Sequence, residues 1–428
     1  MSTTFAALSE RNYRVYAAGS LLSNVGTWFQ NTAQTWLILE LTGSGSAVGA
    51  AIAAQMLPSL MFSPVAGALA DKFDKRTWMS WLQLGMAVPS AILGVLAISG
   101  VAQDWHVYLL AFVFGTARAF EAPVRQSFVA EMVGPSLLSN AVALNSASMN
   151  TGRLIGPAVA GLMIAALGSG VSATGWVILG NAVSYGFVLF GLRMVDPDRL
   201  ILSERAPRGR GAIREGVRYV RARPDLMLLF GVVFCLGAFG MNFQITTALM
   251  ATEEFGRGAG EFGVLGSFMA IGSLSGALLA ARRTRPRLWF VAGSAVVFCC
   301  VQVVSGLMPT YATYAMIMPF LGLTLLTTIT TANALIQLTS APSMRGRVAA
   351  FYMMVFLGST PMGAPFIGWV AEQQGPRFAL ALSGILAGTG ILACLTWFVR
   401  QDTRSLARLR AIRSRERRLT PVIDPTVE

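Results

Sequence analysis

The stretch RMVDPDRLILSERAPRGRGAIREGVRYVRAR, residues 193–223, separates two long apolar blocks of the chain. It holds nine arginines and four acidic residues, together with Pro and Gly. A charged segment with Pro and Gly between two apolar blocks is typical of an aqueous linker between membrane-embedded domains. The sequence therefore predicts bundles over 1–192 and 225–399, a cytoplasmic linker over 193–224 and a basic cytoplasmic tail over 400–428.

The composition excludes an ordinary soluble fold. Of the 428 residues 54% are hydrophobic and only 12% are charged, whereas soluble domains carry about 25% charged residues. Apolar runs long enough to cross the ~30 Å hydrocarbon core recur along the chain. The sequence predicts an all-α membrane protein with twelve transmembrane helices in two six-helix bundles. These helices are expected at about 15–40, 46–70, 77–100, 106–130, 139–167, 173–193, 225–250, 258–281, 288–307, 311–340, 348–371 and 376–399.

The basic residues lie almost entirely on one side of this arrangement. If the N-terminus is cytoplasmic, 28 of the 33 lysines and arginines fall in cytoplasmic segments, and only Arg257 and Arg377 fall on the opposite side. This distribution follows the positive-inside rule and predicts a multi-pass protein of the inner (plasma) membrane with both termini cytoplasmic. Anionic lipid headgroups attract such side chains, so the net charge of +13 indicates a bilayer partner and no nucleic acid.

Landmark residues recur between the halves at one offset. Each of three positions in the first half has a counterpart 207 residues later, which indicates an internal duplication and two pseudo-symmetric bundles. Transporters are often built from such repeats, with the substrate site between them. The pairs are Pro135 with Pro342, Gly156 with Gly363, and Gly161 with Gly368.

The second predicted helix ends in GALADKFDKR, residues 67–76. A plain basic turn explains this composition, but the order also resembles the cytoplasmic-loop signature of the major facilitator superfamily. Asp74 replaces the usual middle Gly, as in drug and siderophore exporters of that superfamily. The resemblance implies a cytoplasmic gating motif made of Gly67, Asp71, Lys72, Lys75 and Arg76.

The fifth predicted helix carries GRLIGPAVAG, residues 152–161. Glycines allow close helix approach and Pro157 removes a backbone donor, so small-residue packing explains the segment on physical grounds. It also resembles the motif of the superfamily's antiporters, with Ala160 in place of one Gly. That resemblance implies an antiporter hinge formed by Gly152, Gly156, Pro157 and Gly161.

Together these motifs are similar to the exporter branch that includes enterobactin-exporter-like and macrolide-efflux-like proteins. The resemblance spans residues from about 10 to 400. It implies the major facilitator fold, a central cavity and alternating access.

Four ionic side chains are predicted at membrane depth. Arg118, Glu121 and Arg125 share one helix face at i, i+3 and i+7, and Arg153 lies on the next helix. Each would cost ~3 kcal/mol facing lipid, so we expect them to face protein or water. Glu121 should pair with Arg118 or Arg125, and alternatively with Arg153. The pair is either purely structural or exchanges a proton during transport.

Uncharged polar residues follow helical spacing on other predicted helices. They either hydrogen-bond neighbouring helices or line the central cavity, and their agreement across helices favours the cavity. They are Thr27, Gln30, Asn31 and Gln34 on the first helix, Asn242 and Gln244 on the seventh, and Thr324, Thr327, Thr328 and Thr331 on the tenth.

The sequence thus predicts a secondary transporter that exports a small amphipathic molecule, drug-like or siderophore, by alternating access and proton antiport. The phosphate-cradling pattern Gly-x-x-x-x-Gly-Lys-(Ser/Thr) is absent from the chain, so we expect no ATP drive. The single His and isolated cysteines predict no enzyme, no metal and no cofactor. A nutrient uptake carrier and a non-transporting receptor or scaffold are the alternatives, and a monomer is expected.

Overall fold

The computed structural model describes residues 3–70, 73–201, 212–282, 287–341 and 344–419, and the described residues contain helices but no strands. The predicted all-α architecture is confirmed. The first half contains η1 (Thr3–Ser9), α1 (Arg11–Thr42), α2 (Gly45–Ala70), α3 (Lys75–Ile98), α4 (Asp104–Ala166), α5 (Val171–Met194) and η2 (Pro197–Arg199). The second half contains α6 (Ala212–Arg221), α7 (Pro224–Cys235), η3 (Leu236–Gly240), α8 (Phe243–Leu249), η4 (Met250–Glu254), α9 (Ala259–Ala281), α10 (Leu288–Gly306), α11 (Tyr311–Thr339), α12 (Arg345–Gln374) and α13 (Pro376–Leu419).

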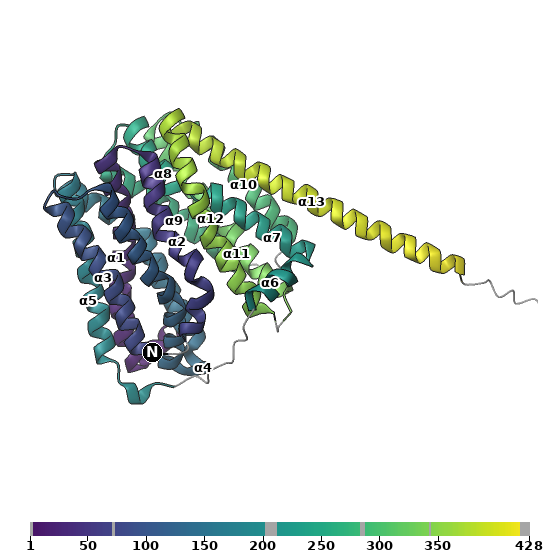
Figure 1. The fold of residues 1–428 in the computed structure, drawn as a ribbon, viewed down its shortest axis with the longest axis horizontal. Coiled ribbons are helices and arrows are strands. Elements are labelled where there is room, and N and C mark those ends of the chain that lie inside the picture. Colours follow the sequence, from purple (N-terminus) through teal and green to yellow (C-terminus); the bar gives the residue numbers. More distant parts are fainter. Residues whose placement is uncertain (1–2, 71–72, 202–211, 283–286, 342–343, 420–428) are drawn as a thin grey trace, which may run out of the picture.

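Among the described residues, ten helical segments are long and apolar enough to cross a membrane. The 63-residue α4 counts once among them, and α1 does not meet the same hydropathy threshold. The number of twelve crossings therefore stays a prediction. The bundles formed by α1–α5 and by α7–α13 lie side by side (Figure 1).

The expected separate helices at 106–130 and 139–167 are joined within α4, because helix continues through the predicted loop. The break is confined to Gly134, whose φ is 68°, a region that only Gly adopts readily. Pro135 follows and cannot continue the hydrogen-bond ladder. A sharp turn at Gly134 thus replaces a connecting loop.

The duplicated glycines make equivalent contacts. Gly156 packs against Trp28 of α1, whereas Gly363 packs against the Ala238 backbone of η3. Both contacts stay within one bundle, with the first crossing segment of that bundle. Pro342 lies outside the described residues.

The other duplicated pair crosses between bundles. Gly161 approaches the start of α9 at Ala259, and Gly368 approaches the start of α2 at Gly45. In each case the small residues let two backbones come together. The pseudo-symmetry expected from the sequence is thus visible in how these helices pack.

The predicted linker 193–224 contains a helix, α6, that was not expected there. Arg347 Nη1 of α12 lies 3.0 Å from Glu215 Oε1, and a Cβ on Gly216 would lie 3.1 Å from the Arg347 carbonyl oxygen. Helix α6 therefore packs on the second bundle. The placement of the domain boundaries themselves stays a prediction.

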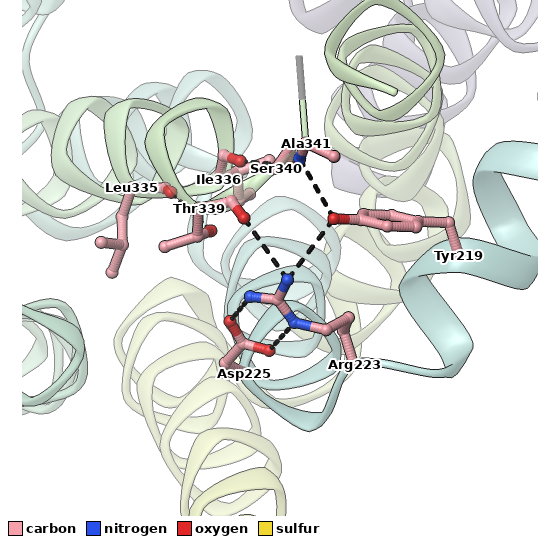
Figure 2. A network of polar contacts seen from close by, with 8 residues as sticks. All are labelled: Tyr219, Arg223, Asp225, Leu335, Ile336, Thr339, Ser340 and Ala341. Carbon is pink, nitrogen blue, oxygen red and sulfur yellow. Dashed lines mark hydrogen bonds and ion pairs between the residues drawn. The ribbon is translucent and has the colours of Figure 1, made fainter. Parts of the chain in front are cut away.

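A polar network ties α6 to the start of α7 and the end of α11 (Figure 2). Arg223 donates to Asp225 Oδ1 at 2.8 Å and Oδ2 at 2.5 Å, and to the Thr339 carbonyl at 3.4 Å. The Tyr219 hydroxyl accepts from Arg223 and from the Ala341 amide at 3.1 Å. Hydrogen bonding to the Asp225 carboxylate raises the pKa of the Arg223 guanidinium, so the guanidinium stays charged.

Helix α13 leaves the bundle and continues as one helix to Leu419 (Figure 1). The predicted basic tail, 400–428, is thus helical over its described part. Residues 420–428 lie outside the described residues.

Candidate functional site

The interior of the first bundle holds the ion pair Glu121–Arg125. Arg125 Nε lies 3.4 Å from Glu121 Oε1, and the side chains are 13% and 11% exposed. Arg125 also lies 3.7 Å from Met149 Sδ on the second part of α4. Of the three arginines considered from sequence, Arg125 is therefore the partner of Glu121.

Arg118 and Arg153 make no ion pair with a described residue. Arg153 instead lies over the indole of Trp28, with its guanidinium carbon 5.6 Å from the ring centroid. Such cation–π contacts contribute about 0.5–1 kcal/mol at exposed sites and about 2 kcal/mol when desolvated. Both arginines are half-buried, so neither faces a fully closed core.

The structure buries a second acidic residue, Glu131, which the sequence did not predict. Glu131 is 3% exposed and forms an ion pair and hydrogen bond with Lys75 at the start of α3. The backbone carbonyl of Glu131 also accepts from the Ile201 amide at 2.8 Å. Glu131 comes just after the predicted end of a helix and lies opposite a basic turn. This position was the feature of the sequence from which the pair could have been predicted.

We expect Lys75→Gln to lower the stability of the protein by about 3 kcal/mol, because it leaves the Glu131 carboxylate buried without a counter-charge. Thermal unfolding in detergent should show a fall in Tm of roughly 5 °C. The double variant Lys75→Gln/Glu131→Gln should recover most of that loss. An unchanged Tm in the single variant would show that Glu131 is hydrated or protonated instead.

The rest of the predicted gating motif is described only in part. Asp71 and Lys72 lie outside the described residues, and so do the surroundings of Gly67. Arg76 donates to the carbonyl oxygens of Leu192 at 2.8 Å and Arg193 at 2.9 Å. These bonds attach the α3 start to the last turn of α5.

The polar stripe on α1 consists of Thr27, Gln30, Asn31 and Gln34. Thr27 and Gln30 form contacts with other helices of their own bundle. The Gln30 amide oxygen accepts from Ser90 Oγ of α3 at 2.6 Å and from Asn181 Nδ2 of α5 at 2.5 Å. Thr27 lies 3.5 Å from the Tyr185 hydroxyl, also on α5. These contacts are the helix–helix hydrogen bonds that were the alternative to cavity lining, and the cavity role of Thr27 and Gln30 stays a prediction.

The remaining α1 residues differ from these. Asn31 Oδ1 accepts from Gln55 Nε2 of α2 at 3.4 Å, a long and weak contact. Gln34 is 4% exposed and its amide oxygen has no partner among the described residues. A buried amide oxygen without a partner is costly, and among the described residues Gln34 is the α1 polar residue in which this occurs.

The stripe on α11 also bonds mainly within its bundle. Thr327 donates to the Gly276 carbonyl of α9 at 3.2 Å, and Thr328 donates to Ser294 Oγ of α10 at 2.9 Å. Thr331 and Thr324 donate to carbonyls of their own helix. This is the helix–helix bonding that was the alternative to cavity lining.

On the seventh predicted helix, Asn242 sits between η3 and α8. It donates to the Ala238 carbonyl at 2.8 Å, while its buried amide oxygen lacks a partner among the described residues. Gln244 is half-buried. Two π-helical segments, η3 and η4, flank this region, and such segments are frequent at functional sites.

The predicted antiporter hinge lies where three helices meet. Gly152 and Gly156 pack on α1, against Asn24 and Trp28. A Cβ added at Gly161 would overlap the Ala259 carbonyl, and one added at Gly263 of α9 would overlap the Pro157 carbonyl. Ser267 Oγ of α9 donates to the Leu154 carbonyl at 2.6 Å.

The bundles also touch at the turn between α1 and α2, which we call the Gly43 end. Glu372 of α12 accepts from Ser44 Oγ at 3.0 Å, from Ser46 Oγ, and from the Ser46 amide at 3.4 Å. The carboxylate thus caps the N-terminus of α2 across the interface, a position favoured by the helix dipole.

We expect Glu372→Gln to weaken this contact by about 1 kcal/mol. Amide hydrogen exchange of residues 44–50 should then rise by roughly fivefold. Glu261→Gln is the matched control, since Glu261 lies at the same end with its carboxylate 3.9 Å from Arg257. Equal exchange in the Glu372 variant and the wild type would remove Glu372 from the contact between the bundles.

Comparisons with known proteins give the family and the fold of the chain. The family described as transmembrane secretion effector, within the major facilitator superfamily, matches residues 2–419. The multidrug efflux pump Tap of Mycolicibacterium fortuitum is 27% identical over 383 residues, covering 86% of this chain and 92% of Tap. The staphyloferrin A transporter of Staphylococcus aureus is 29% identical over 153 residues, covering 36% of this chain and 38% of that protein.

A bacterial homologue of the human lysosomal transporter Spinster, solved in an inward-facing and occupied conformation, has the same fold. The TM-score is 0.72 at 14% identity, over 91% of this chain and 98% of that chain. This likeness shows the predicted major facilitator fold. The chain therefore belongs to the transmembrane secretion effector family of the major facilitator superfamily, and it is a multi-pass membrane transporter and not an enzyme.

Proposed function

We propose that the protein exports a small amphipathic molecule by alternating access and that inward proton flow drives export. The observation that carries the coupling is the Glu121–Arg125 pair, because a carboxylate held at membrane depth is the natural proton carrier in a transporter. Export is supported by Tap, which is named as an efflux pump. Drug-like compounds and siderophores are the cargo classes that Tap and the staphyloferrin A transporter suggest.

The contacts between the bundles support an inward-facing state. Close approaches run from Gly45 with Gly368, at the Gly43 end, to Leu60 with Gly358 near the middle of α2 and α12. The distribution of basic residues favours a Gly43 end that lies outside the cytoplasm. In this state the cargo would enter from the cytoplasm or the inner leaflet.

Transport in inverted membrane vesicles tests the proposal. An acidic interior is established, and a panel of amphipathic compounds that includes a siderophore is added while a pH-sensitive dye reports proton release. We expect at least one compound to dissipate the gradient and to accumulate inside. Accumulation that survives a protonophore, or that runs only in the opposite direction, would contradict proton-driven export.

A further inference from the structure

The membrane-depth charges of the first bundle do not balance. Arg118, Arg125 and Arg153 carry three positive charges, and Glu121 is the only acidic residue at the same depth. Glu121 forms its ion pair with Arg125, so Arg118 and Arg153 have no ion-pair partner among the described residues. The second bundle supplies none, since the sequence has no Asp or Glu over 226–252, 262–371 or 373–401.

These charges cannot be removed by titration, because a guanidinium stays protonated in proteins. An uncompensated charge at membrane depth is expensive, so water or an anion must lie against it. For the Lys75 ammonium, the protein itself supplies a buried counter-charge, the Glu131 carboxylate. At Arg153 no described residue supplies an acid.

Helix geometry shows where Arg153 points. Gly152 and Gly156 face α1, Gly161 faces α9, and Ile155 is 45% exposed. At 3.6 residues per turn, Arg153 projects midway between the sides that face α1 and α9, and opposite Ile155. Since α1 and α9 belong to different bundles, the guanidinium faces the space between the bundles and not the lipid.

Trp28 completes a recognition surface at this point. Its half-buried indole lies beneath the Arg153 guanidinium, which leaves the guanidinium edge available to a bidentate oxyanion. The exposed part of the half-buried indole that Arg153 does not cover suits an apolar or aromatic body. One charged and one flat apolar surface thus lie side by side.

We propose that the cargo is an anionic amphiphile whose carboxylate or similar oxyanion binds Arg153 while its apolar body lies against Trp28. This inference rests on the proposed export function and narrows its cargo to one charge class. Cationic compounds are disfavoured by the net positive charge of the site. A lipid phosphate presents the same oxyanion chemistry, so the experiment separates a small molecule from a lipid.

The test measures binding to the full chain in phosphatidylcholine nanodiscs. The probes are three pyrenes that carry a carboxylate, a carboxamide or a trimethylammonium group on the same four-carbon chain. We expect the carboxylate probe to bind at least about tenfold more tightly than the ammonium probe, the gain of one charge-assisted contact. Arg153→Gln should weaken carboxylate binding by about tenfold and change carboxamide binding less than about twofold.

Two control variants test whether the effect on binding is specific to the charge at Arg153. Arg153→Lys, which keeps the charge, should retain part of the carboxylate preference, whereas Arg257→Gln, 51% exposed outside the site, should retain all of it. Equal binding of carboxylate and ammonium probes by the wild type, or an equal loss of all three in Arg153→Gln, would overturn the proposal. Displacement of the carboxylate probe by added phosphatidylglycerol would overturn the cargo assignment in favour of a lipid.

Binding in nanodiscs needs no ion gradient, so it is independent of the transport test. A protein that prefers the carboxylate probe but shows no proton-driven accumulation would contradict the proposed function alone.

Discussion

Glu121→Gln is expected to lower proton-driven export by at least about tenfold, because an amide cannot release the proton that a membrane-depth carboxylate exchanges. The substitution keeps the size of the side chain, and the amide oxygen can stay beside Arg125 Nε, which lies 3.4 Å from Glu121 Oε1 in the wild type. Folding should therefore be retained. The measurement is the initial rate of dye-reported proton release in inverted vesicles, alongside thermal unfolding of the purified variant.

Glu261→Gln serves as the control, because Glu261 lies at the Gly43 end and is 43% exposed. It should transport at the wild-type rate. Downhill exchange of cargo without a gradient should survive in Glu121→Gln, since binding and the conformational change remain possible. Undiminished coupled transport in Glu121→Gln would leave the Glu121–Arg125 pair with a structural role only.

Gly161→Val is expected to lower export by at least about tenfold, because its side chain enters backbone space where the two bundles meet. A Cβ there already overlaps the Ala259 carbonyl, and a backbone neighbour cannot move aside as a flexible side chain would. Overpacking of this kind costs about 1–3 kcal/mol. The cost falls on the state that is closed at the Gly43 end, so the equilibrium shifts away from it.

The matched control is Gly186→Val on α5, where an added Cβ meets nothing within 4 Å. That variant should export normally, and hydrogen exchange of residues 44–50 should rise only in Gly161→Val. Gly161→Ala should lie between the wild type and the valine variant. Wild-type export by Gly161→Val would show that this approach is not needed for the transport cycle.

The internal duplication could be predicted from the sequence. The offset between Gly161 and Gly368 predicted equivalent roles, and both residues meet the first turn of a helix in the other bundle. Small residues at equal spacing leave a record in sequence because close backbone approach admits no Cβ. The approximate positions of most helices could also be predicted, since an apolar run of sufficient length has few alternatives to a membrane helix.

The contacts of the polar residues were harder to predict from the sequence. The spacing of Thr27, Gln30, Asn31 and Gln34 shows that they share a flank of α1, but not which neighbour that flank meets. The structure turns Gln30 toward Ser90 and Asn181. The rotation of a helix about its own axis is decided by packing against other helices. The periodicity of one helix carries no information about that packing.

The sequence by itself determined the helical membrane fold, the two halves and the presence of ionic side chains at membrane depth, because these depend on composition and on local periodicity. Only the tertiary structure decided that Glu121 pairs with Arg125, that Lys75 meets Glu131, and that Arg153 lies over Trp28. The physical reason is reach: an ion pair needs its atoms within about 4 Å. That distance depends on the depth and rotation of whole helices relative to one another.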